Sequence, residues 1–346
     1  MKILQIVNPA VPIPPKTMGG AERIVHGLIT ELHHLGHKVT LLAEDNSEPP
    51  DGIEFIGIGT YWHQEDTVRR VWQHLVQHGR RYDAIHNHGR LLYYLPRIWG
   101  AAAKVHTFHF GELQERQLRQ FLGLRPRRFA FAPCGHWISE RYRHFGGSWR
   151  PVHNGLPQDL YAPNYAVDDQ APFVCIGRMD PRKGIPQSIE VARRTGRKLI
   201  IAGVIGDQPH EKSWFEENVR RHCDGDQIRF IGPVDDKQKQ VLLSNAAALL
   251  LPIQGSEAFT VVMIEALACG CPVVGFNKYC IPELVKDGVN GLLADDLEDM
   301  IEKVAHLGKI DRRNCRQDFE DRFTARSMAI RYQSLYEDLL RQKTVR

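Results

Sequence analysis

The chain alternates short apolar runs with segments whose apolar residues recur every three or four positions. Ile3 to Val7 is an apolar run of strand length. Ile24, Leu28 and Leu32 then recur at the spacing of one helix face. Val39 to Ala43 is the next apolar run. A strand, a glycine-containing loop, a helix and a strand in this order form a βαβ unit, which predicts a parallel sheet.

The alternation continues through the first half of the chain. It predicts helices over 68–77 and 137–145, and strands over 84–86, 104–108 and 151–153. A polar, proline-rich segment without periodicity follows at 157–172. We interpret this segment as the linker between two domains.

The strand–helix alternation starts again after the linker. It predicts strands over 173–176, 198–202, 228–231, 248–251 and 272–275, and helices over 187–194, 214–222, 238–245 and 260–268. A long terminal helix is expected over 325–340. The sequence therefore predicts an α/β protein with two Rossmann-like parallel-sheet domains, 1–160 and 161–322. A C-terminal segment, 323–346, is expected to pack back on the first domain. Ligands bind at the carboxyl ends of the strands in such sheets, so we expect the site in a cleft between facing domains.

Composition changes this interpretation little. The 346 residues are 42% hydrophobic, enough for two cores. A net charge of +4 is too weak to indicate nucleic acid, but it suits a protein that holds an anion. The seven cysteines form no C-x-x-C pair, which favours reduced thiols in a cytoplasmic protein. The N-terminus lacks the features of a signal peptide, and no apolar run is long enough to span a bilayer. We expect a cytoplasmic protein, with at most peripheral contact at the inner membrane face.

Two common phosphate-binding patterns are missing from the sequence. No G-x-G-x-x-G fingerprint follows the first predicted strand, and no G-x-x-x-x-G-K-[ST] pattern occurs. The sequence therefore supports neither a dinucleotide-dependent dehydrogenase nor P-loop chemistry.

A candidate anion site follows the first strand of the second domain. Gly177, Arg178, Lys183 and Gly184 lie between that strand and a helix. A helix N-terminus offers backbone N–H groups and partial positive charge, and the two cations add to it. These residues indicate a diphosphate site, although a solvated loop with ordinary surface cations has the same pattern.

Two glutamates form the second candidate. Glu257 is expected in a loop, and Glu265 eight positions later within an apolar helix. A carboxylate among apolar residues is costly unless it is hydrogen-bonded. The two hydroxyls of a ribose are suitable partners for Glu265. An exposed helix glutamate is the alternative.

These residues resemble a known family. The segment EAFTVVMIEALACGCPVV, from Glu257 onward, is similar to the E-x7-E signature of family 4 retaining glycosyltransferases, which have the GT-B fold. Further matching segments follow the family's order along nearly the whole chain: PPKTMGGAE (14–22), DAIHNH (83–88), TFH (107–109), HNG (153–155), IGR to KG (176–184), and PELV with Asp287, Gly288 and Gly291 (282–291).

The resemblance implies a role for each matching position. Arg178 and Lys183 hold the donor diphosphate beside Gly177, and Glu265 holds the ribose. Glu257 contacts the donor sugar, while the backbone at Phe259 and Thr260 adds N–H groups. Gly19 and Gly20 let a first-domain loop approach the diphosphate, and His109 lies near the transferred sugar. The catalytic set is then Arg178, Lys183, His109 and Glu257.

The resemblance also implies a hexosyl transfer. The donor is a nucleoside-diphosphate sugar, with a UDP-sugar favoured over a GDP-sugar, and the acceptor is a hydroxyl group. The reaction needs no metal or other cofactor, and it retains the anomeric configuration by front-face attack. One departure concerns the donor sugar. The family usually has glycines on either side of the aromatic residue after the first Glu, where this chain has Ala258 and Thr260.

Two other clusters allow different interpretations. His86 and His88 alternate along one strand, so we expect them on one face, and His106 and His109 lie near the end of the next strand. Four imidazoles suit a metal, but no Asp or Glu accompanies them at ligand spacing, so no metal is predicted. A basic stretch, 116–128, has five arginines among leucines and a phenylalanine. It favours a solvated face, with contact to an anionic membrane or a charged acceptor as the alternative.

Two alternative functions use the same donor site. A sugar-nucleotide hydrolase or epimerase acts on the donor without an acceptor. An inactive donor-binding subunit of a glycosylation complex binds the donor without turnover. The complete set of Arg178, Lys183, Glu257 and Glu265 favours an active transferase over that subunit.

Overall fold

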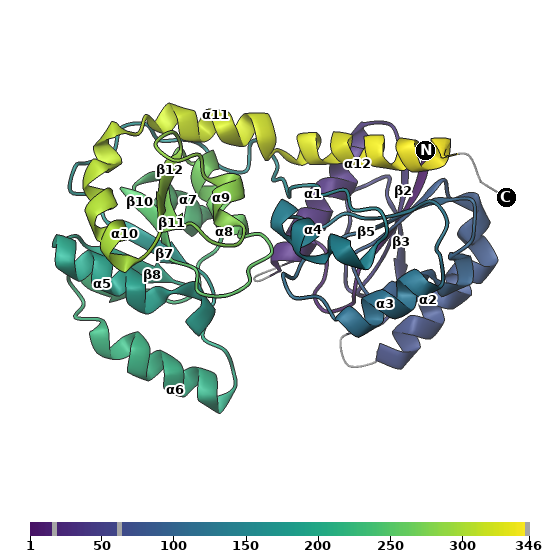
Figure 1. Ribbon diagram of the computed structural model, residues 1–346, viewed down its shortest axis with the longest axis horizontal. Coiled ribbons are helices and arrows are strands. Elements are labelled where there is room, and N and C mark those ends of the chain that lie inside the picture. Colours follow the sequence, from purple (N-terminus) through teal and green to yellow (C-terminus); the bar gives the residue numbers. More distant parts are fainter. Residues whose placement is uncertain (16–18, 61–63, 343–346) are drawn as a thin grey trace. The chain divides into compact units, whose positions relative to one another are not determined.

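The protein divides into two compact units (Figure 1). The computed structural model describes residues 1–15, 19–60 and 64–342. Unit 1 comprises Met1–Pro157 together with the segment that begins at Thr324, and unit 2 comprises Gln158–Phe323. The chain therefore leaves unit 1 once and later returns to it.

Unit 1 is built on a parallel six-stranded sheet. The strand order is β3-β2-β1-β4-β5-β6. The strands are β1 (Lys2–Ile6), β2 (Lys38–Ala43), β3 (Glu54–Gly57), β4 (Ala84–Asn87), β5 (Ala103–His106) and β6 (Phe129–Phe131). The helices are α1 (Gly20–His34), α2 (Gln64–His78), α3 (Glu115–Gly123), α4 (His136–Tyr142) and α12 (Ala325–Arg341), with 3-10 turns at Gly79–Arg81, Leu91–Arg97 and Arg143–Phe145.

Unit 2 repeats this architecture. Its parallel sheet has the order β12-β11-β10-β7-β8-β9. The strands are β7 (Phe173–Ile176), β8 (Leu199–Ala202), β9 (Ile228–Phe230), β10 (Ala248–Leu251), β11 (Val273–Phe276) and β12 (Gly291–Ala294). The helices are α5 (Ile185–Thr195), α6 (Pro209–Asn218), α7 (Asp236–Ser244), α8 (Val261–Ala268), α9 (Ile281–Leu284), α10 (Leu297–Lys303) and α11 (Arg312–Arg322), with 3-10 turns at Pro181–Lys183, Arg220–His222 and Val304–Lys309.

The central strands are covered on both faces, which explains their continuous apolar sequence. Ile3, Leu4 and Ile6 of β1 are fully buried. In β10 the first three residues are fully buried, and Leu251 is 2% exposed. Parallel sheets covered by helices have this pattern, because neither face meets water. The predicted fold class, two Rossmann-like parallel-sheet domains, is confirmed.

The return of the chain to unit 1 depends on a close backbone approach. Thr324 forms a bridge with Leu156, and the Ala325 N–H donates to the Leu156 carbonyl at 2.7 Å. A Cβ on Gly155 would lie 2.3 Å from the Thr324 carbonyl oxygen, so only glycine fits there. The helix α12 then packs against α1 and β5, burying Tyr332 and Tyr336.

The structure corrects the prediction at several edges of the sheets. The predicted strand 151–153 is wrong, because 151–155 is irregular. Pro151 has no N–H to donate, and pairing beyond β6 is limited to one bridge between Phe131 and Trp149. The strands β3, β6 and β12 lie at the outer edges of their sheets and were not predicted. Each has only three or four residues, too few to establish a periodicity.

Candidate active site

The two predicted donor motifs of unit 2 meet at an ion pair. Lys183 Nζ lies 3.0 Å from Glu257 Oε1, and both side chains are about four-fifths buried. Lys183 ends the 3-10 turn after β7, which Asp180 caps by accepting from the Arg182 N–H at 2.9 Å. Glu257 lies in the loop after β10. The structure therefore brings together two segments that lie more than seventy residues apart in the sequence.

Glycine allows the loop after β7 to lie against its neighbours. Gly184 has φ +68°, and a Cβ there would lie 1.9 Å from the Pro252 carbonyl oxygen. Gly203 has φ +148°, and its Cβ would lie 1.6 Å from the Gly177 carbonyl oxygen. A side chain at either position would separate the loops after β7, β8 and β10. These glycines hold the loops at the carboxyl edge of the sheet together.

Arg178 is held by a carboxylate from α6. Its Nη2 donates to Glu211 Oε1, while Glu211 Oε2 accepts from the Gln208 N–H at 3.1 Å in a capping box. The backbone N–H of Gln208 and the guanidinium of Arg178 both lower the pKa of Glu211. The Arg178 side chain remains 46% exposed, so it is accessible to an anionic ligand.

Glu265 is buried, and within the described part of the chain both contacts of its carboxylate fall on one oxygen. Lys239 Nζ lies 2.5 Å from Glu265 Oε1, and the Tyr161 hydroxyl donates to the same atom at 3.2 Å. Asp236 also contacts Lys239 and Tyr161, at 3.1 and 3.0 Å. The buried carboxylate is thus compensated by a cation and a phenol. The prediction did not include Lys239 or Tyr161, which come from a polar helix and from the predicted linker.

The start of α8 adds backbone donors between the two glutamates. Thr260 is the residue before the first helical position, and its side chain does not cap the helix. Phe259 and Thr260 are 8% and 4% exposed. Thr260 Oγ1 instead lies 3.7 Å from Cys280 Sγ. The Thr260 side chain therefore satisfies none of the first backbone N–H groups of α8, although the Met263 N–H donates to the Thr260 carbonyl at 2.9 Å.

In unit 1, α1 begins at Gly20, and Gly19 is the residue before it. Gly19 has φ +151°, and a Cβ there would lie 2.6 Å from the Pro15 Cβ. The Arg23 N–H donates to the Gly19 carbonyl at 2.9 Å in the first helical turn. Residues 16–18 of the matching motif lie outside the described part of the chain. The tight approach explains glycine at position 19.

His109 belongs to a cluster of imidazoles at the end of β5. His109 Nε2 lies 3.0 Å from His88 Nδ1, and the rings of His86 and His88 are 4.0 Å apart, on one face as predicted. Burial lowers the pKa of His109 to about 4 and that of His106 to about 3. These histidines are therefore neutral at neutral pH. Among the described residues, no group of three or more His, Cys, Asp or Glu side chains is arranged to hold a metal ion.

The basic stretch lies on and after α3. Arg116, Arg119, Arg125 and Arg127 are exposed, and the guanidinium of Arg119 lies over the Phe145 ring at 4.4 Å. Arg128 instead donates to the Ala101 carbonyl at 2.7 Å. None of the helices in the described ranges combines the length and apolarity needed to cross a bilayer.

Two family models match the chain in succession. The model described as Glycosyltransferase Family 4 matches residues 18–155, and the model described as Glycosyl transferases group 1 matches residues 160–322. The chain is 27% identical over 160 residues to the N-acetyl-alpha-D-glucosaminyl L-malate synthase of Bacillus anthracis, covering 44% of this chain and 40% of that protein. It is 36% identical over 126 residues to a phosphatidyl-myo-inositol mannosyltransferase of Mycobacterium leprae, covering 34% and 31%. The matched part is thus less than half the length of these curated relatives.

Solved structures match over almost the full chain. The sucrose-phosphate synthase of Thermosynechococcus elongatus has a TM-score of 0.78 at 20% identity, covering 98% of this chain and 99% of that one. Anabaena HepE in complex with UDP-glucose has a TM-score of 0.70 at 19% identity, covering 98% and 99%. The fold is that of the GT-B glycosyltransferases. Within that class, the two family models place the chain in glycosyltransferase family 4, to which it belongs.

Proposed function

We propose that the protein transfers a hexosyl group from a nucleoside-diphosphate sugar to a hydroxyl acceptor, with retention of configuration. The observation that carries this proposal is the Lys183–Glu257 ion pair, at 3.0 Å, beside the accessible Arg178. It joins the expected diphosphate cation to the expected sugar-binding carboxylate. A UDP-sugar is the favoured donor, and a related fold, HepE, has been solved with UDP-glucose.

The donor diphosphate replaces the carboxylates that pair with Lys183 and Arg178 in the free protein. In the free protein, Glu257 neutralises Lys183 and Glu211 neutralises Arg178. A diphosphate offers both cations a stronger, more highly charged partner. Glu257 is then released to accept hydrogen bonds from sugar hydroxyls. Glu265 binds the ribose through Oε2, while Lys239 and Tyr161 retain Oε1.

The reaction takes place on one face of the sugar. The acceptor oxygen forms a bond to the anomeric carbon as the bond from that carbon to the phosphate oxygen breaks. The departing phosphate oxygen takes the proton of the acceptor hydroxyl. Arg178 and Lys183 stabilise the negative charge that grows on the diphosphate, so no metal ion is required. His109 supports the sugar.

The stereochemistry of the product tests this mechanism. Retention through two inversions would need a carboxylate nucleophile and a covalent sugar–enzyme species. Proton NMR of the fresh product from an α-linked donor should show an α-linked sugar. A β-linked product would contradict retention, and a sugar covalently attached to Glu257, detected by mass spectrometry, would contradict front-face attack.

A panel of nucleotide sugars tests the donor. Binding raises the apparent melting temperature by mass action, and UDP-sugars should do so more than GDP-sugars. Product analysis with donor alone separates transfer from hydrolysis or epimerisation. Donor binding without turnover, with every acceptor tried, would indicate an inactive subunit.

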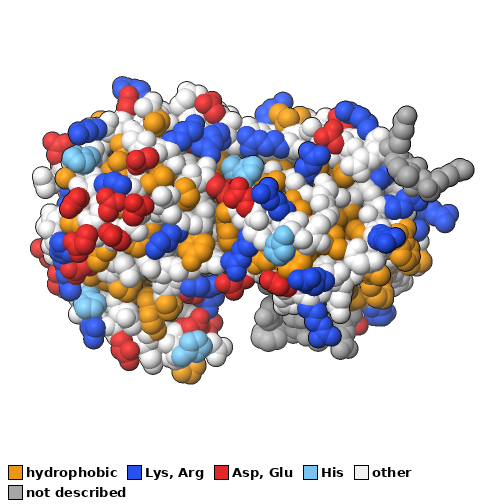
Figure 2. Space-filling view, viewed as in Figure 1, with side chains coloured by type: hydrophobic (Ala, Val, Ile, Leu, Met, Phe, Trp, Pro, Cys, Tyr) orange, Lys and Arg blue, Asp and Glu red, His pale blue; other side chains and the backbone are white. Residues whose placement is uncertain are grey.

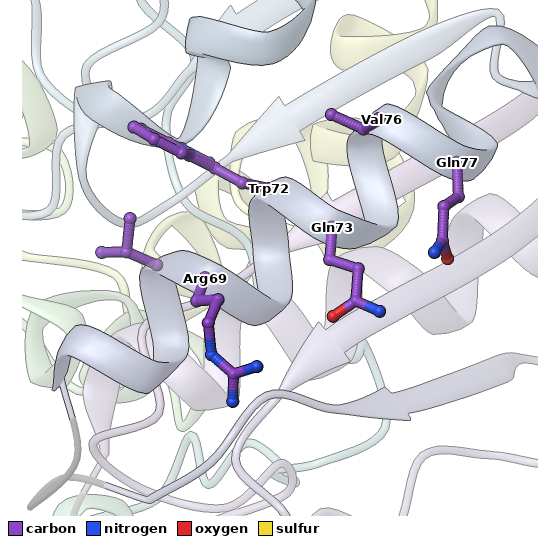
Figure 3. A pocket seen from close by; sticks show the side chains of 6 residues that line it. Arg69, Trp72, Gln73, Val76 and Gln77 are labelled. Atoms are coloured by element: carbon purple, nitrogen blue, oxygen red, sulfur yellow. The ribbon is translucent and has the colours of Figure 1, made fainter.

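We also propose that a cytoplasmic protein of this kind contacts an anionic membrane surface peripherally. A hollow on α2 is lined by Val68, Arg69, Trp72, Gln73, Val76 and Gln77. Figure 3 shows Trp72 and Val76 on one side of the helix and Arg69, Gln73 and Gln77 on another. Figure 2 shows hydrophobic side chains beside basic ones at this edge of unit 1.

The segment 92–99 contacts both this helix face and the basic stretch. Trp72 Nε1 donates to the Leu92 carbonyl at 3.0 Å, and Trp99 Nε1 donates to the Leu124 carbonyl at 2.9 Å. Val76 and Trp99 are 62% and 60% exposed. Tryptophans flanked by arginines suit the interface of an anionic bilayer.

Vesicle sedimentation tests the membrane contact. The protein should sediment with phosphatidylglycerol vesicles and less with phosphatidylcholine vesicles. Val76→Glu should weaken binding, whereas Val241→Glu, at a valine of 61% exposure on unit 2, should not. Equal binding by both variants would contradict this surface.

A further inference from the structure

A continuous line of hydrogen bonds runs from His109 to the C-terminal helix within unit 1. His109 Nε2 contacts His88 Nδ1 at 3.0 Å, and His88 Nε2 contacts Gln5 Oε1 at 2.9 Å. Gln5 Nε2 donates to the Tyr336 hydroxyl at 3.4 Å, which contacts His86 Nδ1 at 2.7 Å. The line continues from His86 Nε2 to Thr107 Oγ1, at 2.8 Å, and from there to the Tyr332 hydroxyl, at 2.8 Å.

The line is shielded from water over most of its length. Gln5, His86 and Tyr336 are fully buried, and Tyr332 is 1% exposed. Burial lowers the pKa values of His86 and His88 well below their usual range and raises the pKa of Tyr336 well above its own. Every member is therefore uncharged at neutral pH. Each imidazole has one N–H donor and one bare acceptor nitrogen.

The Gln5 amide determines which nitrogen carries the proton. Its oxygen faces His88, so His88 Nε2 must be the donor. A neutral His88 then has a bare Nδ1, which accepts from the Nε2–H of His109. On the other side, the Gln5 amide N–H donates to the Tyr336 oxygen, which leaves the Tyr336 hydroxyl proton free to be donated to His86 Nδ1, 2.7 Å away.

We infer that Gln5, through His88, is a positioning residue that holds His109 as the Nε2–H tautomer, with a bare Nδ1. Among the described residues, nothing bonds His109 Nδ1, and the side chain is half-buried. Tyr336 completes the line, because its hydroxyl oxygen accepts from the Gln5 amide and contacts His86 Nδ1. Rotating the amide by half a turn would reverse every donor and acceptor along the line and place the proton of His109 on Nδ1.

The tautomer of His109 determines which kind of sugar substituent can form a hydrogen bond with its Nδ1. A bare nitrogen accepts a hydrogen bond from a hydroxyl and repels a carboxylate, which has no proton to donate. This step rests on the proposed function, in which His109 lies beside the transferred sugar. The site then favours a neutral hexose with a hydroxyl at this position over a hexuronate.

The tautomer can be measured without any ligand. Long-range proton–nitrogen NMR of protein labelled with ¹⁵N-histidine distinguishes the two neutral tautomers and the imidazolium. A His109→Asn variant assigns the signal. We expect the Nε2–H tautomer for both His88 and His109 at neutral pH. A proton on Nδ1 of His109, or an equal mixture of the two tautomers, would overturn the inference.

Two substitutions test the role of the line, with a matched control. Gln5→Leu removes the acceptor of His88, and Tyr336→Phe removes the partner of the Gln5 amide, so both should give mixed tautomers at His109. Tyr94→Phe removes another fully buried hydroxyl of unit 1, one that bonds the Val105 carbonyl outside the line. It should leave the His109 signal unchanged. A single tautomer at His109 in the folded Tyr336→Phe variant and also in Gln5→Leu would contradict the assigned role.

Donor binding separates this inference from the proposed function. If UDP-glucose binds, UDP-glucuronic acid should bind at least about fivefold more weakly, the value of one lost hydrogen bond. Gln5→Leu should reduce that preference, and Tyr94→Phe should not. If neither nucleotide sugar binds while the tautomer is as expected, the proposed function fails and the tautomer assignment stands. If UDP-glucuronic acid binds as well as UDP-glucose, the selection fails although the donor site is real.

Discussion

Acidification should destabilise unit 1 far more than unit 2. Burial lowers the pKa of His74 to about 4, that of His106 to about 3 and that of His109 to about 4. In the unfolded chain each imidazole has a pKa near 6.5. Below that pH the unfolded state takes up protons that the folded state does not. The stability conferred by these neutral histidines is therefore present above about pH 6.5 and is lost as the pH falls toward their folded pKa values.

The magnitude follows from the proton difference. Each group loses about 1.4 kcal/mol per pH unit over this interval, so a change to about pH 5 costs about 2 kcal/mol per histidine. His74, His106 and His109 together cost about 6 kcal/mol, and His86 and His88 act in the same direction. The stability of a domain is usually about 5–15 kcal/mol. A loss of about 6 kcal/mol is therefore roughly half of a mid-range stability. The three histidines of unit 2, His210, His222 and His306, are not buried.

Urea unfolding followed by tryptophan fluorescence measures this effect. Trp214 is the one tryptophan in the sequence of unit 2, so Trp214→Phe leaves a signal from unit 1. The free energy of unfolding of unit 1 should fall by about 6 kcal/mol or more between about pH 7 and about pH 5. His74→Gln, which keeps a polar group near the Tyr82 hydroxyl, should reduce that loss by about 2 kcal/mol. A free energy that changes by less than about 1 kcal/mol would refute the reasoning.

Three further predictions concern the donor site and the core. Arg178→Ala and Lys183→Ala should each lower kcat about 100- to 1000-fold, because each removes a preorganised charge from the leaving diphosphate. Steady-state kinetics measures this, with Lys198→Ala, at an exposed lysine paired with Asp226, as a control of unchanged rate. Wild-type rates in both site variants would contradict the phosphate assignment. EDTA should leave the reaction rate unchanged. If EDTA abolishes activity and only added metal restores it, the histidine cluster must be reconsidered as a metal site. Burial, followed by the charges of Arg128 and Arg127, lowers the pKa of Lys104 to about 7. Above that pH the unfolded chain retains a proton that the folded chain has lost. The free energy of unfolding should therefore rise by about 2–3 kcal/mol between about pH 7 and about pH 9. Lys104→Met should abolish that rise in urea titrations, and a rise that persists would show that another group causes it.

The sequence predicted the inner strands of both sheets and the edge strand β9, but not the edge strands β3, β6 and β12. The strands near residues 3, 39 and 173 are mostly apolar, because both of their faces are covered. The edge strand β3 has partly exposed residues, so its sequence gives no clear period. The irregular 157–172 segment is confirmed as lacking helix and strand, although Tyr161 within it is buried.

The candidate site was predicted in part because its residues fall into local motifs. Lys183 and Glu257 were identified from separate segments, and the structure adds that they form an ion pair. Lys239 lies on a helix whose sequence is polar, and nothing local indicates that it compensates the buried Glu265. The same holds for Gln5 and Tyr336, which lie 331 positions apart and meet only in the folded chain. The assigned roles of the site residues remain predictions.

The discontinuity of unit 1 has a consequence for protein synthesis. Residues 158–323 form one continuous segment. All the residues of unit 2 are therefore available for folding once this segment has emerged from the ribosome. Unit 1 lacks α12 until the whole of unit 2 has been synthesised, because α12 follows unit 2 in the sequence. Tyr332 and Tyr336, which fill its interior beside His86, are made only after unit 2. The nascent N-terminal half must therefore wait, with an incomplete core, while the later half folds. This reverses the usual order in which the first-synthesised domain is completed first, and it leaves apolar surface of the early chain exposed for longer during synthesis.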